Sequence, residues 1–420
     1  MFFIHKNLNM LFFYRLGLIF YFFLILISSP FNQKAKLWLI GRKNIFKKIK
    51  DTVKKKNKLA WFHCASLGEF EQGRPLIEAY REKLPDYEIL LTFFSPSGYE
   101  IRKNYNKADY IFYLPIDSPL NAKRFLDIVN PDIVFFIKYE FWHYYINELG
   151  KRKVPLYLVS GIFRENQRFF KWYGRSFRKV LMHFNSFFVQ NLQSQDLLKS
   201  IGYNNSIVTG DTRFDRVYDI AKQTQRLPLI EKFKQKQMVL ILGSSWQPDE
   251  DLVIKYFNET TNELKLIIAP HEVSKENVNR IVKNISGGKT VLKYSDANES
   301  NVETANVLLI DSIGLLSSLY KYGDIAYIGG GFGKGIHNIL EAATFGLPVI
   351  FGPNYQKFKE AVDLIQLGGA FSISNYNELI TVFTDIISNP EKLEQASKVA
   401  ADFIENNRGA TIKIIKSFSV

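Results

Sequence analysis

Residues 59–83 read LAWFHCASLGEFEQGRPLIEAYREK, and this stretch decides the fold. The short apolar run Leu59–Cys64 predicts a buried strand, and the mixed apolar and polar run Glu71–Lys83 predicts an amphipathic helix. A strand that leads directly into a helix is the repeating unit of a parallel α/β sheet. The chain is therefore predicted to be an α/β protein.

Further strand and helix patterns follow in two groups. Predicted helices include Ala122–Val129 and Gln193–Ser200. The first group of predicted strands is Leu59–Cys64, Glu88–Phe94, Tyr110–Leu114, Ile133–Ile137, Leu156–Val159 and Ser186–Val189. The second group is Met238–Leu242, Leu264–Ala269, Val307–Ile310, Ile325–Ile328 and Pro348–Phe351. Two groups predict two Rossmann-like domains that face a cleft with the carboxyl ends of their strands.

The predicted domain organisation has five parts. A hydrophobic anchor at 1–33 precedes a first α/β domain at 34–218. A polar, strand-poor linker at 219–236 leads to a second α/β domain at 237–388. The tail at 389–420 is predicted to be helical and to pack back across the first domain.

Composition excludes several classes of protein. Hydrophobic residues make up 46% and charged residues 23%, which excludes a disordered chain and a polytopic membrane protein. The single cysteine, Cys64, excludes an intramolecular disulfide and a cysteine-based zinc site. The six histidines form no His-x-x-x-His pattern, so no metal is expected. The net charge is +14, but the basic residues crowd near the N-terminus, so no nucleic-acid partner is expected.

The N-terminal segment is apolar enough to meet a membrane. Met10–Ile27 contains one charged residue, Arg15, and approaches the roughly 20 apolar residues that a span needs. Many lysines follow between Lys34 and Lys58, which predicts that this flank is cytoplasmic. We interpret the segment as a single membrane anchor. The alternative is a buried or interfacial hairpin that does not cross the membrane.

Glu69 is the first candidate for chemistry. Small residues follow the strand that ends at Cys64, and Glu69 then stands at the start of the next helix. Ligands of open α/β sheets bind at the carboxyl ends of strands, and a general base must be an ionised carboxylate in such a place. The alternative is that Glu69 caps its helix and is solvated.

A glycine-rich loop is the second candidate. Residues 328–341 read IGGGFGKGIHNILE, with a strand before the loop and a helix predicted to begin near His337. Glycines let backbone N–H groups approach a phosphate, and a helix N-terminus favours an anion. The spacing fits neither a Walker loop nor G-x-G-x-x-G. Glu341 is expected to reach ribose hydroxyls. The alternative is a tight turn that serves packing alone.

Three shorter segments follow strands of the second group. Leu242–Trp246, Ala269–Glu272 and Asp311–Leu315 are each more typical of a loop than of a ligand site, but together they describe a nucleotide pocket on one rim. Asp249–Asp251 resembles the acidic triplet of metal-dependent sugar transferases. We interpret it instead as negative charge at the start of the next helix.

Several motifs together resemble one family. They are Gly41–Lys43, Ser66–Glu69, Glu140–Trp142, Gly210–Asp215, and Gly329–Glu341 continuing to Phe351–Pro353. Their order and spacing, from about Lys34 to the C-terminus, resemble the 3-deoxy-D-manno-octulosonic acid (Kdo) transferases of lipopolysaccharide synthesis. The resemblance implies a GT-B fold, an inner-membrane anchor, CMP-Kdo as donor, no metal, and a lipid A precursor (lipid IVA) as acceptor. The transfer would be inverting and would occur at the cytoplasmic face.

The resemblance also implies roles for single residues. Glu69 would be the catalytic base, and Arg213 stands where the family has a basic residue that stabilises the transition state. The implied nucleotide contacts are Pro270, His271, Ile313, Gly314, Leu315, Asn338, Ile339, Leu340 and Glu341.

The chain departs from the family pattern at a few positions. Lys138 stands where the family often has Glu, Arg213 replaces Lys, and Ile339 replaces a common Pro. The arginine usually found between the residues matching Pro270 and His271 is missing. Two alternatives stay open: another GT-B transferase that uses a UDP-sugar and a lipid-linked acceptor, and a non-catalytic membrane protein that binds a nucleotide sugar.

Overall fold

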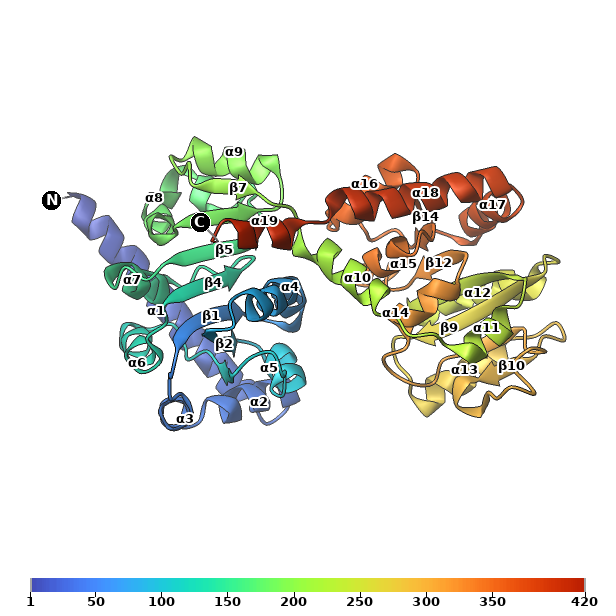
Figure 1. Cartoon of the computed structure of the whole chain (residues 1–420), viewed down its shortest axis with the longest axis horizontal. Coiled ribbons are helices and arrows are strands. Elements are labelled where there is room, and N and C mark those ends of the chain that lie inside the picture. Colours follow the sequence, from blue (N-terminus) through green and yellow to red (C-terminus); the bar gives the residue numbers. More distant parts are fainter. Residues whose placement is uncertain (1, 419–420) are drawn as a thin grey trace. The chain divides into compact units, whose positions relative to one another are not determined.

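The computed structural model describes residues 2–418, without the side chains of residues 2–10 and 176. Residue 1 of the predicted anchor and residues 419–420 of the predicted tail lie outside the described residues. By packing, the chain divides into two units, which Figure 1 colours along the sequence. Unit 1 comprises residues 1–216 and 409–420, and unit 2 comprises residues 217–408.

Unit 1 is built on a seven-stranded sheet of order β3-β2-β1-β4-β5-β6-β7, in which all strand pairs are parallel. Its strands are β1 (Lys58–Cys64), β2 (Tyr87–Phe93), β3 (Tyr110–Tyr113), β4 (Ile133–Ile137), β5 (Leu156–Gly161), β6 (Ser186–Val189) and β7 (Ser206–Val208).

Helices cover both faces of this sheet. They are α1 (Phe2–Ser28), α2 (Gln33–Arg42), α3 (Ile45–Thr52), α4 (Leu67–Lys83), α5 (Pro96–Arg102), α6 (Pro119–Val129), α7 (His143–Lys151), α8 (Arg175–Arg178), α9 (Leu192–Ser200), the start of α10 (Thr212–Lys222), and α19 (Ala410–Lys416). Three short 3₁₀ turns, η1 (Arg168–Phe170), η2 (Trp172–Gly174) and η3 (Leu181–His183), lie between β5 and β6.

Unit 2 repeats this architecture with a second seven-stranded parallel sheet, of order β10-β11-β9-β8-β12-β13-β14. Its strands are β8 (Met238–Ser245), β9 (Leu264–Pro270), β10 (Val291–Lys293), β11 (Val307–Leu309), β12 (Ile325–Ile328), β13 (Val349–Phe351) and β14 (Ala370–Ser372). Its helices are α11 (Pro228–Lys234), α12 (Gln247–Glu259), α13 (Lys275–Asn284), α14 (Leu316–Leu319), α15 (Leu340–Thr344), α16 (Lys359–Leu367), α17 (Tyr376–Ile387) and α18 (Pro390–Asn407). Two 3₁₀ turns, η4 (Tyr294–Asp296) and η5 (Tyr320–Tyr322), complete the unit.

The two α/β domains predicted from the sequence are confirmed, and the predicted strands form. Three strands were missed: β7, β10 and β14. Each has three residues and lies at an end of its sheet. The predicted strands β11 and β13 are equally short but wholly apolar, whereas each missed strand contains a polar residue and therefore does not stand out from a loop.

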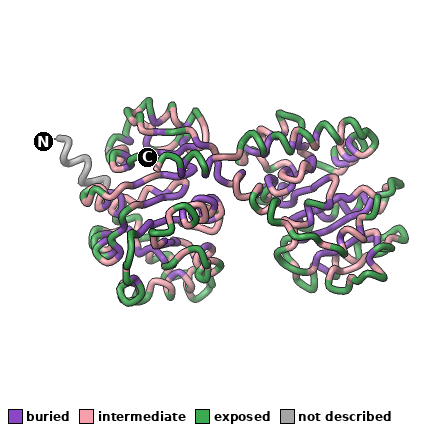
Figure 2. The backbone as a smooth tube through the Cα atoms, in the orientation of Figure 1, coloured by how far each residue is buried: buried purple, intermediate pink, exposed green. Residues whose placement is uncertain are grey.

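The cores follow from the parallel sheets, which are covered on both faces and therefore need apolar side chains on both. Figure 2 shows buried strands at the centre of each unit. Trp61, Phe62 and Phe135 are fully buried in unit 1, and Tyr327 and Ile350 are fully buried in unit 2.

The predicted linker and tail contain helices that belong to different units. α11, within residues 219–236, buries Ile230 and Phe233 in unit 2. α18 also belongs to unit 2, whereas α19 buries Ile414 and Ile415 in the core of unit 1. The last helix therefore packs on the first domain, and the preceding one does not.

The Gly41–Arg42 pair has a structural role. The Arg42 guanidinium lies 3.9 Å from the Trp38 ring centroid and donates to the carbonyl oxygens of Phe94 (2.7 Å) and Leu114 (3.1 Å). A Cβ on Gly41 would lie 2.1 Å from the Tyr113 ring. These contacts fix α2 against the ends of β2 and β3.

Helix α1 lies along unit 1. Near its middle, the Tyr14 hydroxyl donates to Asp117 at 2.6 Å, and further along, the Tyr21 ring stacks on Phe94 with a centroid distance of 6.1 Å. The segment Leu11–Ser28 is the one helix in the described residues that is long and apolar enough to cross a membrane. Its other faces are exposed, including Phe13 and Phe20.

Candidate active site

Glu69 lies at the carboxyl end of β1, in the first turn of α4. The Ser66 backbone N–H and hydroxyl both donate to Glu69 Oε2 at 2.8 Å, and the Glu69 N–H donates back to Ser66 Oγ at 3.5 Å. This capping box is what the alternative interpretation predicted for Glu69. The side chain is nevertheless half-buried rather than fully solvated. Among the described residues, its second oxygen, Oε1, accepts no hydrogen bond.

The environment of Glu69 favours the protonated form. Burial raises the pKa of the Glu69 carboxyl, and the charge of Glu140 raises it further. The hydrogen bonds from Ser66 and the nearby His63 lower it, without cancelling the rise. A raised pKa moves a carboxylate toward the pH at which general bases are most effective.

Glu69 and Glu140 meet because of the strand order. β1 pairs with β2 on one side and with β4 on the other, so the sheet reverses direction between β1 and β4. Open α/β sheets form their ligand crevice at this switch point. Glu69 follows β1 and Glu140 follows β4, and both therefore stand at the switch point of unit 1.

His63 is fully buried beside Glu140. The Trp142 indole N–H donates to His63 Nε2 at 2.9 Å, and Glu140 Oε2 lies 3.2 Å from the same nitrogen. Because an indole N–H only donates, Nε2 accepts this bond, and the imidazole proton lies on Nδ1. Nδ1 then donates to Thr92 Oγ1 at 2.9 Å.

Arg213 lies in the first turn of α10, also in unit 1. Its Nε and Nη2 both approach Asp211 Oδ2 at 2.8 Å, and Asp211 also accepts from the Gln72 amide at 3.1 Å. Arg213 and Arg164 both lower the pKa of Tyr139, against a larger rise caused by burial. Arg213 thus lies close to the loop that carries Glu140.

The glycine-rich loop of unit 2 follows β12, and β12 and β8 flank the switch point of the second sheet. A Cβ on Gly329 would lie 2.4 Å from the Ser244 carbonyl oxygen, and one on Gly331 would lie 2.5 Å from the Gly352 nitrogen. Close packing of backbone on backbone therefore requires these two glycines. The prediction of a helix from His337 is wrong: α15 begins at Leu340, because Ile336 and Ile339 are drawn into the core as loop residues.

The acidic triplet begins in the first turn of α12, as predicted, and Asp249 also supports the glycine-rich loop, which was not predicted. Asp249 accepts hydrogen bonds from the backbone N–H of Gly330 (2.9 Å) and of Trp246 (3.0 Å) in the first turn of α12. Glu250 accepts from the Ser245 hydroxyl at 2.8 Å and pairs with Arg280. Within residues 2–418, no group of three or more His, Cys, Asp or Glu side chains is arranged to hold a metal ion.

Three aromatic rings lie beside the glycine-rich loop. His271 stacks on Trp246 with a centroid distance of 4.5 Å and on His337 with one of 4.6 Å. The Trp246 indole N–H donates to His337 Nε2 at 3.0 Å. Burial lowers the pKa of His337, and the neighbouring His271 lowers it further. The rings thus join the ends of β8 and β9 to the loop after β12.

The structure brings most of the predicted nucleotide contacts to this edge of unit 2. Glu341 accepts from Ser317 at 2.6 Å and from Asn338 at 3.0 Å, which ties the segment after β11 to the segment after β12. Ile313 is 89% exposed at the same edge. The Ile339 and Leu340 side chains are buried, so these two residues offer a ligand only their backbone.

The sequence analysis did not predict which side chains contact one another in the two candidate sites. His63, Glu140 and Trp142 form one network, and the signal available was only that each lies at or just after the end of a strand. Trp246 and His337 were part of quoted loops, but their contact across 91 positions had no local signal.

Comparison with known proteins relates the sequence of this chain to one family. Residues 41–216, which contain the first sheet with Glu69, Glu140 and Arg213, match the family model of 3-deoxy-D-manno-octulosonic-acid transferase (kdotransferase). A 3-deoxy-D-manno-octulosonic acid transferase of Aquifex aeolicus is 28% identical over 371 residues, which cover 86% of this chain and 95% of the relative. That of Haemophilus influenzae is 26% identical over 376 residues, covering 84% and 85%. Over most of its length the chain is therefore similar to Kdo transferases.

Two solved structures agree with the fold described above. UDP-GlcNAc 2-epimerase of Neisseria meningitidis has a TM-score of 0.60 and 17% identity, covering 86% of this chain and 98% of that chain. MurG of Acinetobacter baumannii has a TM-score of 0.55 and 12% identity, covering 86% and 98%. At these identities the likeness concerns the fold alone, and the fold is GT-B.

Lys138, the departure from the family pattern, has an unusual backbone. It follows β4 with φ of 71°, in the left-handed region that non-glycine residues seldom adopt. Its ammonium lies 5.3 Å from the Tyr139 ring centroid. The turn at Lys138 directs the chain so that Glu140, two residues later, reaches His63.

Proposed function

We propose that this protein is a glycosyltransferase that moves Kdo from CMP-Kdo to a lipid A precursor, with Glu69 as general base and with inversion at the anomeric carbon. The observation that carries the proposal is the half-buried Glu69 carboxyl of raised pKa at the switch point of unit 1. Its sequence context, residues 41–216, is the part that matches the Kdo transferase model.

Glu69 is prepared to take a proton at one atom. Ser66 occupies Oε2 with two hydrogen bonds, so Oε1 is the oxygen that accepts the proton of the acceptor hydroxyl. A positioned general base contributes about 10²- to 10⁴-fold to a rate. A single base and direct displacement of the phosphate leave the product with the opposite anomeric configuration.

Arg213 supplies positive charge for the negative charge that develops during transfer. Its bonds to Asp211 hold the guanidinium in a fixed orientation. Preorganised charge of this kind stabilises a transition state without reorganising as the reaction proceeds. The Arg213 charge is partly balanced by Asp211, so we assign it a contribution smaller than that of Glu69.

The edge of unit 2 is the proposed donor site. Backbone N–H groups of Gly329–Gly335 hold the CMP phosphate, since glycines allow the close approach. α15 has five residues, so the loop itself contributes more to this site than a helix dipole does. Pro270, His271 and Ile313–Leu315 contact the nucleoside, and Glu341 retains acceptor capacity for a ribose hydroxyl. The transfer proceeds without a metal.

The exposed faces of α1 are the proposed membrane contact, at the cytoplasmic face of the inner membrane. Phe12, Phe13, Ile19 and Phe20 are each more than half exposed, and lysines follow from Lys34. Cations near an anionic membrane surface contribute about 1 kcal/mol each. α1 also touches unit 1 along its length, so we propose that it lies in the interface rather than crossing it.

The test is product mass in a coupled assay. CMP-Kdo is generated in situ and supplied with a tetra-acylated lipid A precursor and the detergent-solubilised full chain. A mass increase of one or more Kdo units supports the proposal. No increase, with the donor supply verified, contradicts it. In that case a thermal-shift comparison of cytidine and uridine nucleotides separates a UDP-sugar transferase from a protein that only binds nucleotide sugars.

A further inference from the structure

A cavity of about 820 Å³ opens in unit 1 beside the Glu69 cluster. Three segments line it: the middle of α1, the loop between β4 and α7, and the segment after β5 that contains η1 and η2. Glu140 is part of its wall, and Glu140 and the proposed base Glu69 stand at the same switch point, after the neighbouring strands β4 and β1.

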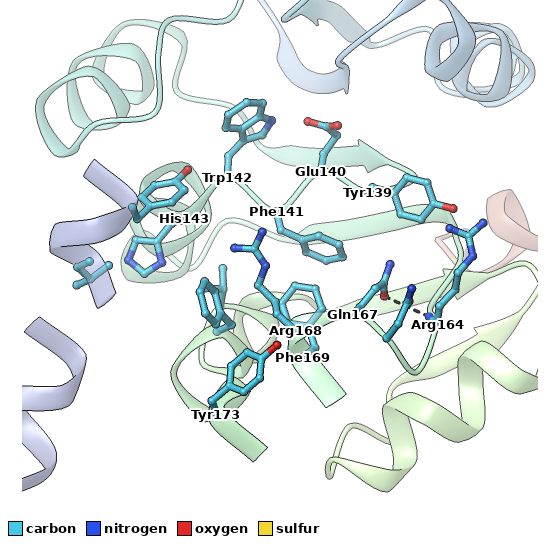
Figure 3. A pocket seen from close by; sticks show the side chains of 15 residues that line it. Tyr139, Glu140, Phe141, Trp142, His143, Arg164, Gln167, Arg168, Phe169 and Tyr173 are labelled. Atoms are coloured by element: carbon cyan, nitrogen blue, oxygen red, sulfur yellow. Dashed lines mark hydrogen bonds between the residues drawn. The ribbon is translucent and has the colours of Figure 1, made fainter. Parts of the chain in front are cut away.

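Two arginines line this cavity. Arg168 extends toward Trp142 and His143, whereas Arg164 points toward Tyr139 (Figure 3). Both are exposed, and the described contact of the Arg168 guanidinium is with the Phe177 ring, at 4.7 Å, rather than with a carboxylate. Residues 164–179 include six basic residues and one acidic residue. The cavity mouth therefore attracts an anion.

The opposite wall is apolar and comes from α1. Leu11 and Tyr14 line the cavity, and two bonds hold the helix there: Tyr14 to Asp117 at 2.6 Å, and Arg15 Nε to the Tyr144 hydroxyl at 2.5 Å. Asp117 is 1% exposed and also accepts from the backbone N–H of Tyr144 at 3.0 Å. On the other side of α1, apolar side chains are exposed. Leu11 in the cavity and the exposed apolar side chains of α1 offer contacts to a ligand with apolar chains.

We propose that this cavity binds the acceptor as an anionic lipid, with a phosphate of its sugar headgroup on Arg168 and Arg164 and its acyl chains along Leu11 and α1. This inference rests on the proposed function. A guanidinium presents paired N–H donors that match a phosphate, and such charged bonds are stronger than neutral ones. α1 is on this account part of the substrate site and not only a membrane contact.

The test compares R168Q with the wild type, both as full chains in mixed detergent micelles. Two acceptors are used: a tetra-acylated disaccharide that carries phosphates, and the same lipid after enzymatic removal of the phosphates. R168Q is expected to raise the KM of the phosphorylated acceptor about tenfold, which corresponds to about 1.4 kcal/mol. It should leave kcat within about twofold and the KM of the dephosphorylated acceptor unchanged. The rise expected for the phosphorylated acceptor agrees with the contribution of one charge-assisted hydrogen bond, about 1.5–3 kcal/mol. R168K should recover part of the loss.

R226Q is the charge-matched control. Arg226 is exposed in unit 2 and pairs with Glu231, so its loss removes the same charge without touching the cavity. A second pair isolates the α1 wall. L11S and L16S make α1 equally less apolar, but only Leu11 lines the cavity, while Leu16 is exposed. L11S should raise the acceptor KM more than L16S does.

The outcomes separate the two proposals. If the wild type transfers no Kdo to either lipid, the proposed function fails. If the wild type transfers Kdo and R168Q leaves the acceptor KM unchanged, the acceptor cavity is wrong. A rise in the KM of CMP-Kdo instead would assign the cavity to the donor and also overturn the inference. A thermal melt checks folding, and if R168Q unfolds, the same criteria apply to R168K.

Discussion

The two units place different chemistry at the same point of the same fold. At the β1/β4 switch point of unit 1, His63 is fully buried and Glu140 is 8% exposed. The chemical properties of the side chains there are therefore set by burial and by neighbouring charges. At the β8/β12 switch point of unit 2, Trp246 is 38% exposed and glycines line the loop. The groups there therefore contribute mainly the shape of a surface that a ligand can contact. One sheet edge is suited to moving a proton and the other to recognising a ligand.

The largest effect is expected at the buried edge. E69Q keeps the geometry of the capping box, since Gln serves at this position, but removes the base. We expect kcat for Kdo transfer to fall about 10²- to 10⁴-fold. CMP protection in a thermal shift should not change, because the proposed donor site is in unit 2. The measurement is initial rate at saturating acceptor and donor.

E71Q is the control for E69Q. Glu71 is two residues further along α4 and pairs with Arg102 at 2.8 Å. Its loss should leave kcat within about twofold, as an exposed ion pair contributes about 0–1 kcal/mol. If folded E69Q has near-normal turnover, Glu69 is not the base, and the proposed difference between the sheet edges of the two units is wrong.

The next effect is expected in the glycine-rich loop. G331A puts a Cβ 2.5 Å from the Gly352 nitrogen, a backbone atom that cannot move aside. We expect the free energy of unfolding to fall by about 1–3 kcal/mol and CMP binding to weaken with it. Urea unfolding and calorimetric titration with CMP measure the two quantities.

G333A is the matched control in the same loop. Its Cβ would lie 3.5 Å from the nearest described atom, the Gly330 carbonyl oxygen, which is ordinary contact. It should retain stability and CMP binding. Equal behaviour of the two variants would mean that the loop does not depend on close backbone packing.

The sequence predicted what local patterns determine. Short apolar runs marked eleven of the strands, since each must be buried on both faces. Glu69 was found because a carboxylate after a strand stands at a sheet edge whatever its distant neighbours are. The GT-B fold and the family followed from motifs spread along the chain.

The remainder depends on contacts that only the folded chain makes. The raised pKa of Glu69 depends partly on Glu140, which follows a different strand. The cavity that Arg168 lines is also lined by Tyr14 of α1, which is more than 150 positions away in the sequence. The start of α15 was misplaced because Ile336 and Ile339 are buried as loop residues, and burial of this kind overrides the local helix signal. None of these contacts is visible in the spacing of residues.

A moderate effect is expected from the ring stack of unit 2. W246A removes one ring of the stack with His271 and the hydrogen bond to His337. Stacking of a base on an aromatic side chain contributes about 1–3 kcal/mol, so CMP affinity should fall at least about fivefold. W246F keeps a ring and should lose less. If W246A binds CMP as the wild type does, the stack does not belong to the donor site.

The smallest effect concerns the pH dependence of the buried edge. The base must be ionised, so kcat/KM falls as pH decreases through the pKa of Glu69. Burial raises this pKa first, and the charge of Glu140 second, against the lowering by Ser66 and His63. E140Q removes only the second contribution. The pKa of Glu69 should therefore fall, and the acid limb of the kcat/KM profile should move to lower pH. E71Q, whose charge is not among the causes of the Glu69 shift, should leave the limb in place. An acid limb that stays fixed in E140Q would show that the two carboxylates at this switch point do not act on each other.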